Sequence, residues 1–209
     1  MQIDPSNLER RELFELVGRS ISPLPVVLVS TVSPDGIYNA APYSFVSPIS
    51  YQPPRVSISF GLREGQKKDT LRNIESSHDF VLNIVDEALI GQTVKTSADY
   101  ADGVDETKEV GLTSVKSEMV RSPRIREAKI SMECRLVHEL EIPEKIREGK
   151  GLGLRAIVFG EIILWHISKQ VWIDGKINSA CPWTVGRVGP ELYCRTGDVF
   201  KIEKPEGTI

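Results

Sequence analysis

The strongest constraint on the fold of this chain is a series of strand-like runs that are joined by turn sequences instead of by helices. Val26–Val32 is an almost continuous apolar run, which is typical of a strand that is buried on both faces. Ser33–Gly36 follows as a turn, because Pro34 presets the first bend and Gly36 accepts a positive φ. Tyr38–Ser47 is therefore predicted to return antiparallel to the first run as the second half of a β-hairpin.

Further strand patterns extend this arrangement. Val56, Ile58 and Phe60 alternate with serines, which is the period of a half-buried strand that begins at Pro53-Pro54. Gly160 is predicted to form a bulge or a bend. The other predicted strands are Phe80–Val85, Ala128–Ile142, Leu154–Ile167 and Val171–Ile173, the last followed by a hairpin turn at Asp174–Lys176. About six or seven strands in hairpins favour a mainly β fold that closes into an antiparallel barrel, since closure removes exposed strand edges.

A few short helices are predicted around the barrel. Residues 7–17 form the first, because Ser6 and Glu9 have the spacing of a capping box and Gly18 is a suitable stop. Residues 69–77 and 87–97 are also predicted to be helical. The polar segment 97–126 is interpreted as a solvated connection with one helical turn near Glu106–Glu109; the alternative is a functional or partner-contacting segment, as connections of this length often are. Glu144–Gly153 is predicted to be a charged turn.

The length of 209 residues predicts a single domain that spans residues 1–209. Its core is expected at about residues 20–175. The tail, residues 176–209, is expected to pack on the barrel or on a partner subunit, and shows little regular pattern before Val199–Ile202.

Composition and motifs exclude several classes of function. Acids outnumber bases, 29 against 26, which argues against a nucleic-acid-binding protein. No apolar run reaches the roughly 18 residues that span a bilayer, and the N-terminus lacks a secretory pattern, so a cytoplasmic protein is expected. Cys134, Cys181 and Cys194 form no CxxC pair and are interpreted as reduced thiols, with no metal site. Glycine-rich nucleotide-binding motifs are absent from the sequence, and no histidine is assigned a catalytic role.

One stretch of the sequence combines features of a ligand site. Asn39–Phe45 is small and polar with single aromatic residues, which suits a backbone that approaches a flat ligand closely. Lys67 and Lys68 precede a helix that is predicted to begin with Asp69 as its N-cap. Free N–H groups and the helix dipole at such a start favour anions. The residues therefore predict a site for a planar ring and a phosphate, without choosing among phosphorylated planar ligands.

Each of these candidates also has a purely structural interpretation. Ser30 and Thr31 have the β-propensity of ordinary strand residues, and Lys67 and Lys68 would by default be solvated surface charges. Asn73 could be an ordinary exposed helix residue. Arg187 and Tyr193 lie in the irregular tail, where pairing of the arginine with acids at a contact between subunits is favoured over a ligand contact.

Several segments together resemble the flavin reductase-like family of FMN-binding split β-barrels. The resemblance rests on Pro25–Gly36, Asn39–Phe45 with Pro53-Pro54, Lys68–Ile74, Gly111–Thr113 and Gly186–Gly189, and it covers nearly the whole chain. It implies an antiparallel, Greek-key-like split barrel and a homodimer that holds FMN noncovalently near the subunit interface. The flavin ring would lie along Ala41–Phe45, and its phosphate near the helix start at Lys67–Thr70.

The cofactor-binding residues expected from the pattern and the resemblance are Ser30, Thr31, Asn39, Ala41, Pro42, Tyr43, Ser44, Phe45, Ser59, Lys67, Lys68, Asp69, Thr70 and Asn73. No catalytic side chain is assigned, because a flavin carries the redox chemistry itself.

The resemblance implies an FMN-binding oxidoreductase that reduces flavin with NADH or NADPH and serves a small-molecule redox substrate. The alternative is an electron-transfer flavoprotein, similar to a flavoredoxin, without nicotinamide activity. A third hypothesis is a barrel that no longer binds the cofactor. The residues name neither the nicotinamide donor nor the electron acceptor.

Overall fold

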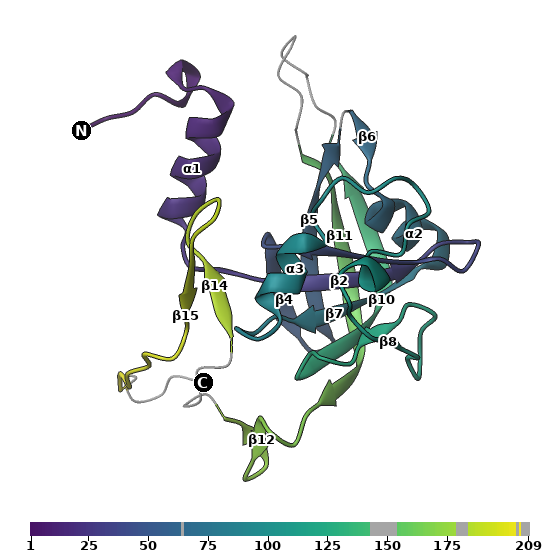
Figure 1. Cartoon of the computed structure of the whole chain (residues 1–209). Coiled ribbons are helices and arrows are strands. Elements are labelled where there is room, and N and C mark those ends of the chain that lie inside the picture. Colours follow the sequence, from purple (N-terminus) through teal and green to yellow (C-terminus); the bar gives the residue numbers. More distant parts are fainter. Residues whose placement is uncertain (64, 143–153, 179–183, 204, 206–209) are drawn as a thin grey trace.

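The computed structural model describes residues 1–63, 65–142, 154–178, 184–203 and 205. The predicted charged turn Glu144–Gly153 and Cys181 lie outside these residues. Figure 1 shows a strongly curled sheet with short helices around it, and a smaller unit, formed by α1 and the β14–β15 hairpin, on one side. The predicted class, a mainly β antiparallel split barrel with short peripheral helices, is confirmed.

The large sheet is antiparallel throughout, in the order β3-β2-β7-β10-β11-β5-β4, with β6 paired to β5. Its strands are β2 (Val27–Val32), β3 (Tyr38–Tyr43), β4 (Val46–Tyr51), β5 (Pro54–Arg63), β6 (Gln66–Lys67), β7 (Asp79–Ile84), β10 (Ile130–Glu141) and β11 (Leu154–Ile167).

The first predicted hairpin is confirmed only in part. The segment Tyr38–Ser47 does not form one strand, because the chain leaves the β2 partner at Tyr43 and crosses through Ser44 and Phe45 to β4. As a result β3 and β4 stand at opposite ends of the sheet, and no ladder between them occurs among the described residues. The sheet is therefore a half-barrel instead of the fully closed barrel expected from the hairpin pattern.

The core of the half-barrel is aliphatic and aromatic, and includes the fully buried Ile58, Phe60 and Phe80. Gly160 belongs to this packing: a Cβ at this position would lie 2.3 Å from Cζ of Phe80. Gly160 itself pairs in register with Leu136, and the register shift predicted for this region lies on the partner strand, between Leu136 and His138. The glycine is thus required by the Phe80 ring.

The helices are α1 (Arg10–Ser20), α2 (Asp69–Ser77), α3 (Ile90–Lys95) and α4 (Glu106–Glu109). The predicted bounds of α2 are confirmed, although its N-cap is Lys68 and Asp69 is the first helical residue. The predicted start and stop of α1 are wrong. Pro5–Asn7 forms a separate 3₁₀ turn (η1), the capping contact is made by Glu12 on the N–H of Glu9, and the helix continues through Gly18.

The segment 97–126 is not the solvated connection that its polarity predicts. It contains α4 and two short strands, β8 (Ser114–Val115) and β9 (Arg124–Ile125). The two strands pair with each other. Two buried carboxylates bind its backbone: Asp79 accepts from the N–H groups of Arg121 and Ser122, and Glu133 from those of Glu118 and Met119. Buried backbone N–H groups need such acceptors, so this long segment is held against the barrel.

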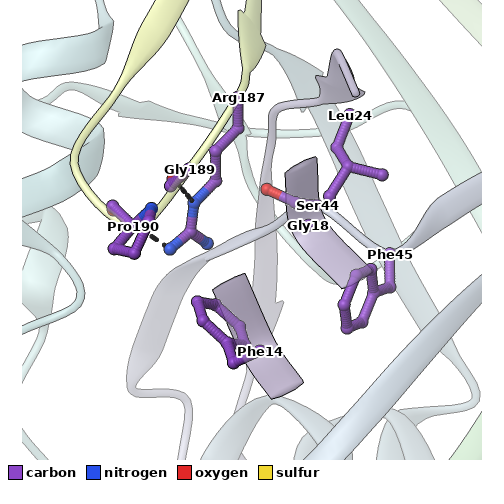
Figure 2. A pocket seen from close by; sticks show the side chains of 8 residues that line it. All are labelled: Phe14, Gly18, Leu24, Ser44, Phe45, Arg187, Gly189 and Pro190. Carbon is purple, nitrogen blue, oxygen red and sulfur yellow. Dashed lines mark hydrogen bonds between the residues drawn. The ribbon is translucent and has the colours of Figure 1, made fainter. Parts of the chain in front are cut away.

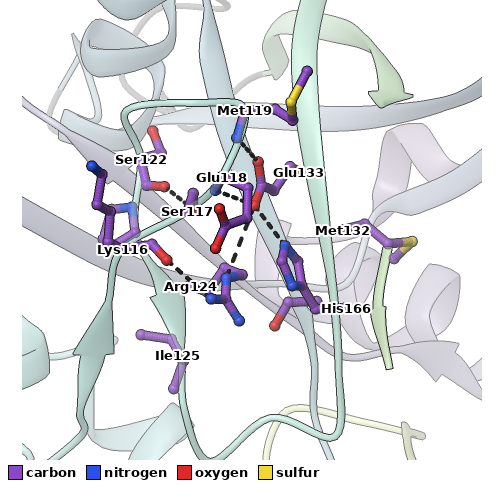
Figure 3. A network of polar contacts seen from close by, with 12 residues as sticks. Lys116, Ser117, Glu118, Met119, Ser122, Arg124, Ile125, Met132, Glu133 and His166 are labelled. Carbon is purple, nitrogen blue, oxygen red and sulfur yellow. Dashed lines mark hydrogen bonds and ion pairs between the residues drawn. The ribbon is translucent and has the colours of Figure 1, made fainter. Parts of the chain in front are cut away.

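Glu133 is the centre of that contact, as Figure 3 shows. Its side chain is fully buried, and it also receives a 2.6 Å hydrogen bond from Nε2 of His166 and lies 3.9 Å from Nε of Arg124. Burial raises the pKa of Glu133, but the hydrogen bonds from Glu118, Met119 and His166 outweigh burial and leave the pKa below its ordinary value.

The C-terminal part contains more regular structure than its sequence indicates. β1 (Leu24–Pro25), β14 (Val185–Arg187) and β15 (Tyr193–Arg195) form a three-stranded sheet beside α1 (Figure 1). β12 (Trp172–Ile173) and β13 (Lys176–Ile177) form the predicted hairpin, with Asp174 and Gly175 at φ 51° and 76°. Val199–Ile202 lies in no helix or strand, and Val199, Phe200 and Ile202 are exposed.

Candidate functional site

A cavity of about 710 Å³ lies between the edge strand β3, the start of α2 and the segment that leads into α4. Among its walls are several of the predicted cofactor-binding residues: Asn39, Ala41, Pro42, Lys67, Lys68, Asp69 and Thr70. The opposite wall is formed by residues 96–102 and Glu106. The structure therefore brings together the small polar strand and the cationic helix start that the sequence singles out.

Asn39 connects the strand to the helix. Its Oδ1 accepts hydrogen bonds from Oγ1 of Thr70 at 2.9 Å and from Oγ1 of Thr31 at 3.2 Å. Thr31 in turn accepts a 3.0 Å hydrogen bond from Nδ2 of Asn73. All four side chains are buried, so this network fixes α2 against β2 and β3 and sets the position of Thr70 at the cavity.

Glu106 completes the network from the other side and is the functional candidate that sequence reasoning missed. Its Oε1 accepts from Nδ2 of Asn39 at 2.7 Å, and its Oε2 accepts from the backbone N–H of Ala40 at 3.1 Å. Burial raises the pKa of Glu106. Nothing in the sequence separates this acid from the others in segment 97–126, although the one predicted helical turn does carry it.

The two lysines before α2 have different surroundings. Nζ of Lys67 forms ion pairs with Glu75 and Glu141, and the hydrogen bond with Glu75 raises its pKa. Lys68 lies over the ring of Tyr43, with Nζ 5.9 Å from the ring centroid. Burial, and then repulsion by Arg63, lowers the pKa of Lys68. Lys68 is therefore the more suitable contact for an anion.

Two arginines at the cavity are already paired with the opposite wall. Arg63 lies 2.5 Å from Oδ1 of Asp99, and Arg72 lies 3.5 Å from Oδ1 of Asp102 while also contacting Asp69. The two carboxylates of the opposite wall are highly exposed, so both contacts are accessible to solvent and to salt.

Ser44 and Phe45 line a second, smaller cleft instead of the large cavity. This cleft has a volume of about 80 Å³ and is mostly apolar, with Phe14, Leu24 and Pro190 among its other walls (Figure 2). Ser59 lines neither space and donates its backbone N–H to the carbonyl of Phe45 at 3.0 Å. Ser44 and Phe45, where the chain leaves β3, therefore do not line the cavity that Asn39, Ala41 and Pro42 line.

Arg187 shapes the small cleft. Its guanidinium lies 5.4 Å from the ring centroid of Phe14, and its Nε and Nη2 donate to the carbonyls of Gly189 and Pro190 at 2.9 and 3.1 Å (Figure 2). Tyr193 pairs with Arg187 across the β14–β15 ladder and is not part of the cleft wall. The tail residue Arg187 therefore holds α1 and the C-terminal hairpin together.

Some predicted residues lie in the protein interior. The hydroxyl of Ser30 donates to the carbonyl of Pro123 at 2.5 Å and accepts from Nδ2 of Asn83 at 2.9 Å, and the side chain is fully buried. Thr31 is equally buried, and Asn73 faces a different, smaller cavity. Tyr43 packs its ring 4.8 Å from Phe60. The surroundings of these residues give them a supporting position behind the cavity wall.

Among the described residues, His, Cys, Asp and Glu side chains form no group of three or more that could hold a metal ion. No helix in that part of the chain combines the length and apolar character needed to cross a membrane. Cys134 and Cys194 are free thiols, and burial raises the pKa of Cys134.

The chain is similar to known proteins over most of its length. Residues 18–178 match the model of the flavin reductase like domain. The chain is 30% identical over 207 residues to an uncharacterized protein of Halalkalibacterium halodurans, with 98% of this chain and 97% of the relative covered.

Two solved structures are similar over nearly their full length. Nitrilotriacetate monooxygenase component B from Bacillus cereus has a TM-score of 0.88 at 27% identity, with 97% of this chain and 98% of that chain covered. Pseudomonas fluorescens 2-nitrobenzoate 2-nitroreductase has a TM-score of 0.86 at 29% identity, with coverages of 100% and 98%.

Proposed function

This chain belongs to the flavin reductase-like family, and from that premise we propose that it is an FMN-binding oxidoreductase that reduces flavin with NADH or NADPH. The observation that carries the proposal is the large cavity in which β3, Lys68 and the start of α2 meet. The similar monooxygenase component and nitroreductase support a redox role.

The residues present fit FMN at both of its ends. The cavity, about 710 Å³, lies within the range of small-molecule sites. Burial and, after it, repulsion by Arg63 lower the pKa of Lys68, and a phosphate beside these two cations would relieve their repulsion. Lys68 also stands at the start of a nine-residue helix, where free backbone N–H groups and the helix dipole favour an anion.

The ring end of the site would be formed by β3 and the residues that follow it. Ala41 and Pro42 line the cavity with short side chains, so a flat ring could lie against the backbone. Ser44 and Phe45 continue this wall toward the small cleft. When bound, FMN supplies the electron chemistry, and the chain holds and orients it. The proposed contacts are Asn39, Ala41, Pro42, Ser44, Phe45, Lys68, Asp69 and Thr70, with Ser30, Thr31, Tyr43, Ser59, Lys67 and Asn73 in support.

We further propose that the protein acts as a homodimer. Phe14 and Val17 of α1 and its C-cap residue Ile21 are 45%, 46% and 66% exposed, and Phe14 lines the same cleft as Phe45. Exposed apolar side chains that gather in this way are typical of protein–protein interfaces. A second copy that covers α1 would also lie near the ring end of the proposed flavin site.

The direct test combines flavin binding with turnover. Purified protein titrated with FMN should quench flavin fluorescence, and addition of NADH or NADPH should oxidise the nicotinamide faster than free FMN does. Absence of turnover with either donor, in protein that does bind FMN, would contradict the reductase activity and leave the flavin site intact.

The second candidate is a flavoprotein that exchanges electrons with a partner and does not use nicotinamides. It is favoured by the absence of a glycine-rich dinucleotide motif from the sequence. Protein-bound FMN that is reduced by dithionite, but stays oxidised with NADH and NADPH, would select this candidate.

A further inference from the structure

Glu106 lies at an unusual position, against the free edge of the large sheet. β3 is the last strand at this edge, so N–H groups that point away from β2 need another acceptor. Oε2 of Glu106 accepts the N–H of Ala40 at 3.1 Å, and Oε1 accepts Nδ2 of Asn39 at 2.7 Å. Glu106 is 7% exposed and therefore offers both oxygens to β3 inside the protein.

The contact with Glu106 decides the orientation of Asn39. Because Nδ2 is held by a carboxylate, Oδ1 must face the opposite side, where it accepts from Thr31 and Thr70. If the amide of Asn39 turned over, its N–H groups would face the Thr70 hydroxyl and its oxygen would face the Glu106 carboxylate. Glu106 thus controls both the β3 backbone and the hydroxyl at the helix start.

We propose that Glu106 is a positioning residue for the flavin: it holds the Asn39–Ala41 backbone in place for the ring and, through the hydrogen bond from Thr70 to Asn39, fixes the start of α2 for the phosphate. This inference rests on the proposed FMN site. Glu106 itself lines the large cavity together with Asn39, Ala41 and Thr70, so the contacts it makes lie directly behind the proposed ligand.

Glu133 provides a matched control for a purely structural role. It is also a buried carboxylate, and it accepts two backbone N–H groups of the same segment 97–126. Glu133 does not line the large cavity. Glu133→Gln should therefore lower the melting temperature but leave the FMN dissociation constant within about twofold of the wild-type value.

Glu106→Gln should weaken FMN binding, because an amide can accept from Asn39 or from Ala40 but not from both. If the correctly arranged site then holds a tenth of the molecules, the FMN dissociation constant rises about tenfold. Riboflavin should lose less affinity, since it makes no contact at the phosphate end. Glu106→Asp, whose shorter side chain cannot span both donors, should give the same pattern and replaces Glu106→Gln if that variant does not fold.

A reciprocal exchange tests the geometry itself. In the double variant Asn39→Asp, Glu106→Gln, the glutamine donates to the new carboxylate and accepts from Ala40, while the carboxylate still accepts from Thr31 and Thr70. Asn39→Asp alone sets two carboxylates against each other and should weaken FMN at least as much as Glu106→Gln. The double variant should recover FMN affinity to within about threefold of the wild-type value.

These titrations separate the inference from the function on which it rests. Wild-type protein that does not bind FMN would overturn both. Wild-type binding with unchanged affinity in the Glu106 variants would overturn the positioning role alone. The same conclusion would follow if the double variant recovered no affinity, or if Glu133→Gln weakened FMN as much as Glu106→Gln.

Discussion

At the scale of single residues, the two lysines before α2 differ in their availability to a ligand. Lys67 is engaged by Glu75 and Glu141, whereas Lys68 is the cation that lies beside Arg63 and over the ring of Tyr43. Lys68→Ala should raise the FMN dissociation constant about tenfold or more, the loss expected for one charge-assisted contact. Lys67→Ala should have a smaller effect.

Fluorescence titration with FMN and riboflavin in parallel measures this difference. Riboflavin lacks the phosphate, so its affinity should change little in Lys68→Ala. Equal losses for both ligands would place the phosphate away from Lys68, and a larger loss in Lys67→Ala would reverse the assignment of the two lysines.

The lowered pKa of Glu133 predicts how the free energy of unfolding depends on pH. Its folded-state pKa is below the ordinary value, so its contribution is present above the ordinary carboxyl pKa and is lost as the pH falls through the folded-state pKa. The free energy of unfolding of wild type should therefore exceed that of Glu133→Gln at neutral pH. Below the ordinary pKa of 4.5 the difference should shrink.

Urea unfolding of wild type and Glu133→Gln at several pH values between neutral and acid measures whether this stability difference shrinks as the pH falls. His166→Ala should remove part of the same contribution, since its ring contacts the carboxylate at 2.6 Å. A stability difference that is constant, or that grows as the pH falls, would contradict the assignment.

At the scale of elements, the segment that carries Asp99 and Asp102 faces β5 and α2 across the large cavity. Its carboxylates lie on Arg63 and Arg72, which would otherwise face the phosphate of FMN. The double change Asp99→Asn, Asp102→Asn should therefore strengthen FMN binding several-fold at low ionic strength, because two negative charges near the phosphate are removed.

The dependence on salt distinguishes this electrostatic effect from a change in folding. Both side chains are exposed, so the advantage of the double variant should disappear at about 0.5 M NaCl, where exposed charges are screened. Weaker FMN binding by the double variant would mean that these ion pairs hold the cavity in its binding shape.

At the scale of the whole molecule, the exposed apolar face of α1 predicts the oligomeric state. Val17→Glu places a charge on this face and should shift the protein from dimer to monomer in sedimentation velocity experiments, because a buried unpaired charge opposes association. If the second copy closes the flavin site, FMN affinity should fall together with dimerisation.

Met119→Glu is the control for this change. Met119 is 53% exposed and lies on the segment bound by Glu133, not on α1. Its substitution should leave the sedimentation coefficient unchanged. A wild-type protein that sediments as a monomer at micromolar concentration would contradict the dimer.

Local sequence patterns were sufficient for most of the sheet and for one helix. Val27–Val32, Pro54–Arg63 and Asp69–Ser77 follow from strand periodicity, turn residues and helix-start signals, because such preferences act between neighbours in the sequence. The resemblance to split-barrel flavoproteins added the family, which the match over residues 18–178 confirms.

Only the tertiary structure decided which polar residues are buried and which partners they meet. Glu106 meets Asn39 across 67 positions, and Asp79 meets Ser122 across 43, so no local pattern distinguishes these acids from solvated ones. The same holds for Ser30, whose partner is Pro123. Burial removes water as a competing hydrogen-bond partner, and a buried polar group must then find its partner in whatever element the fold brings beside it.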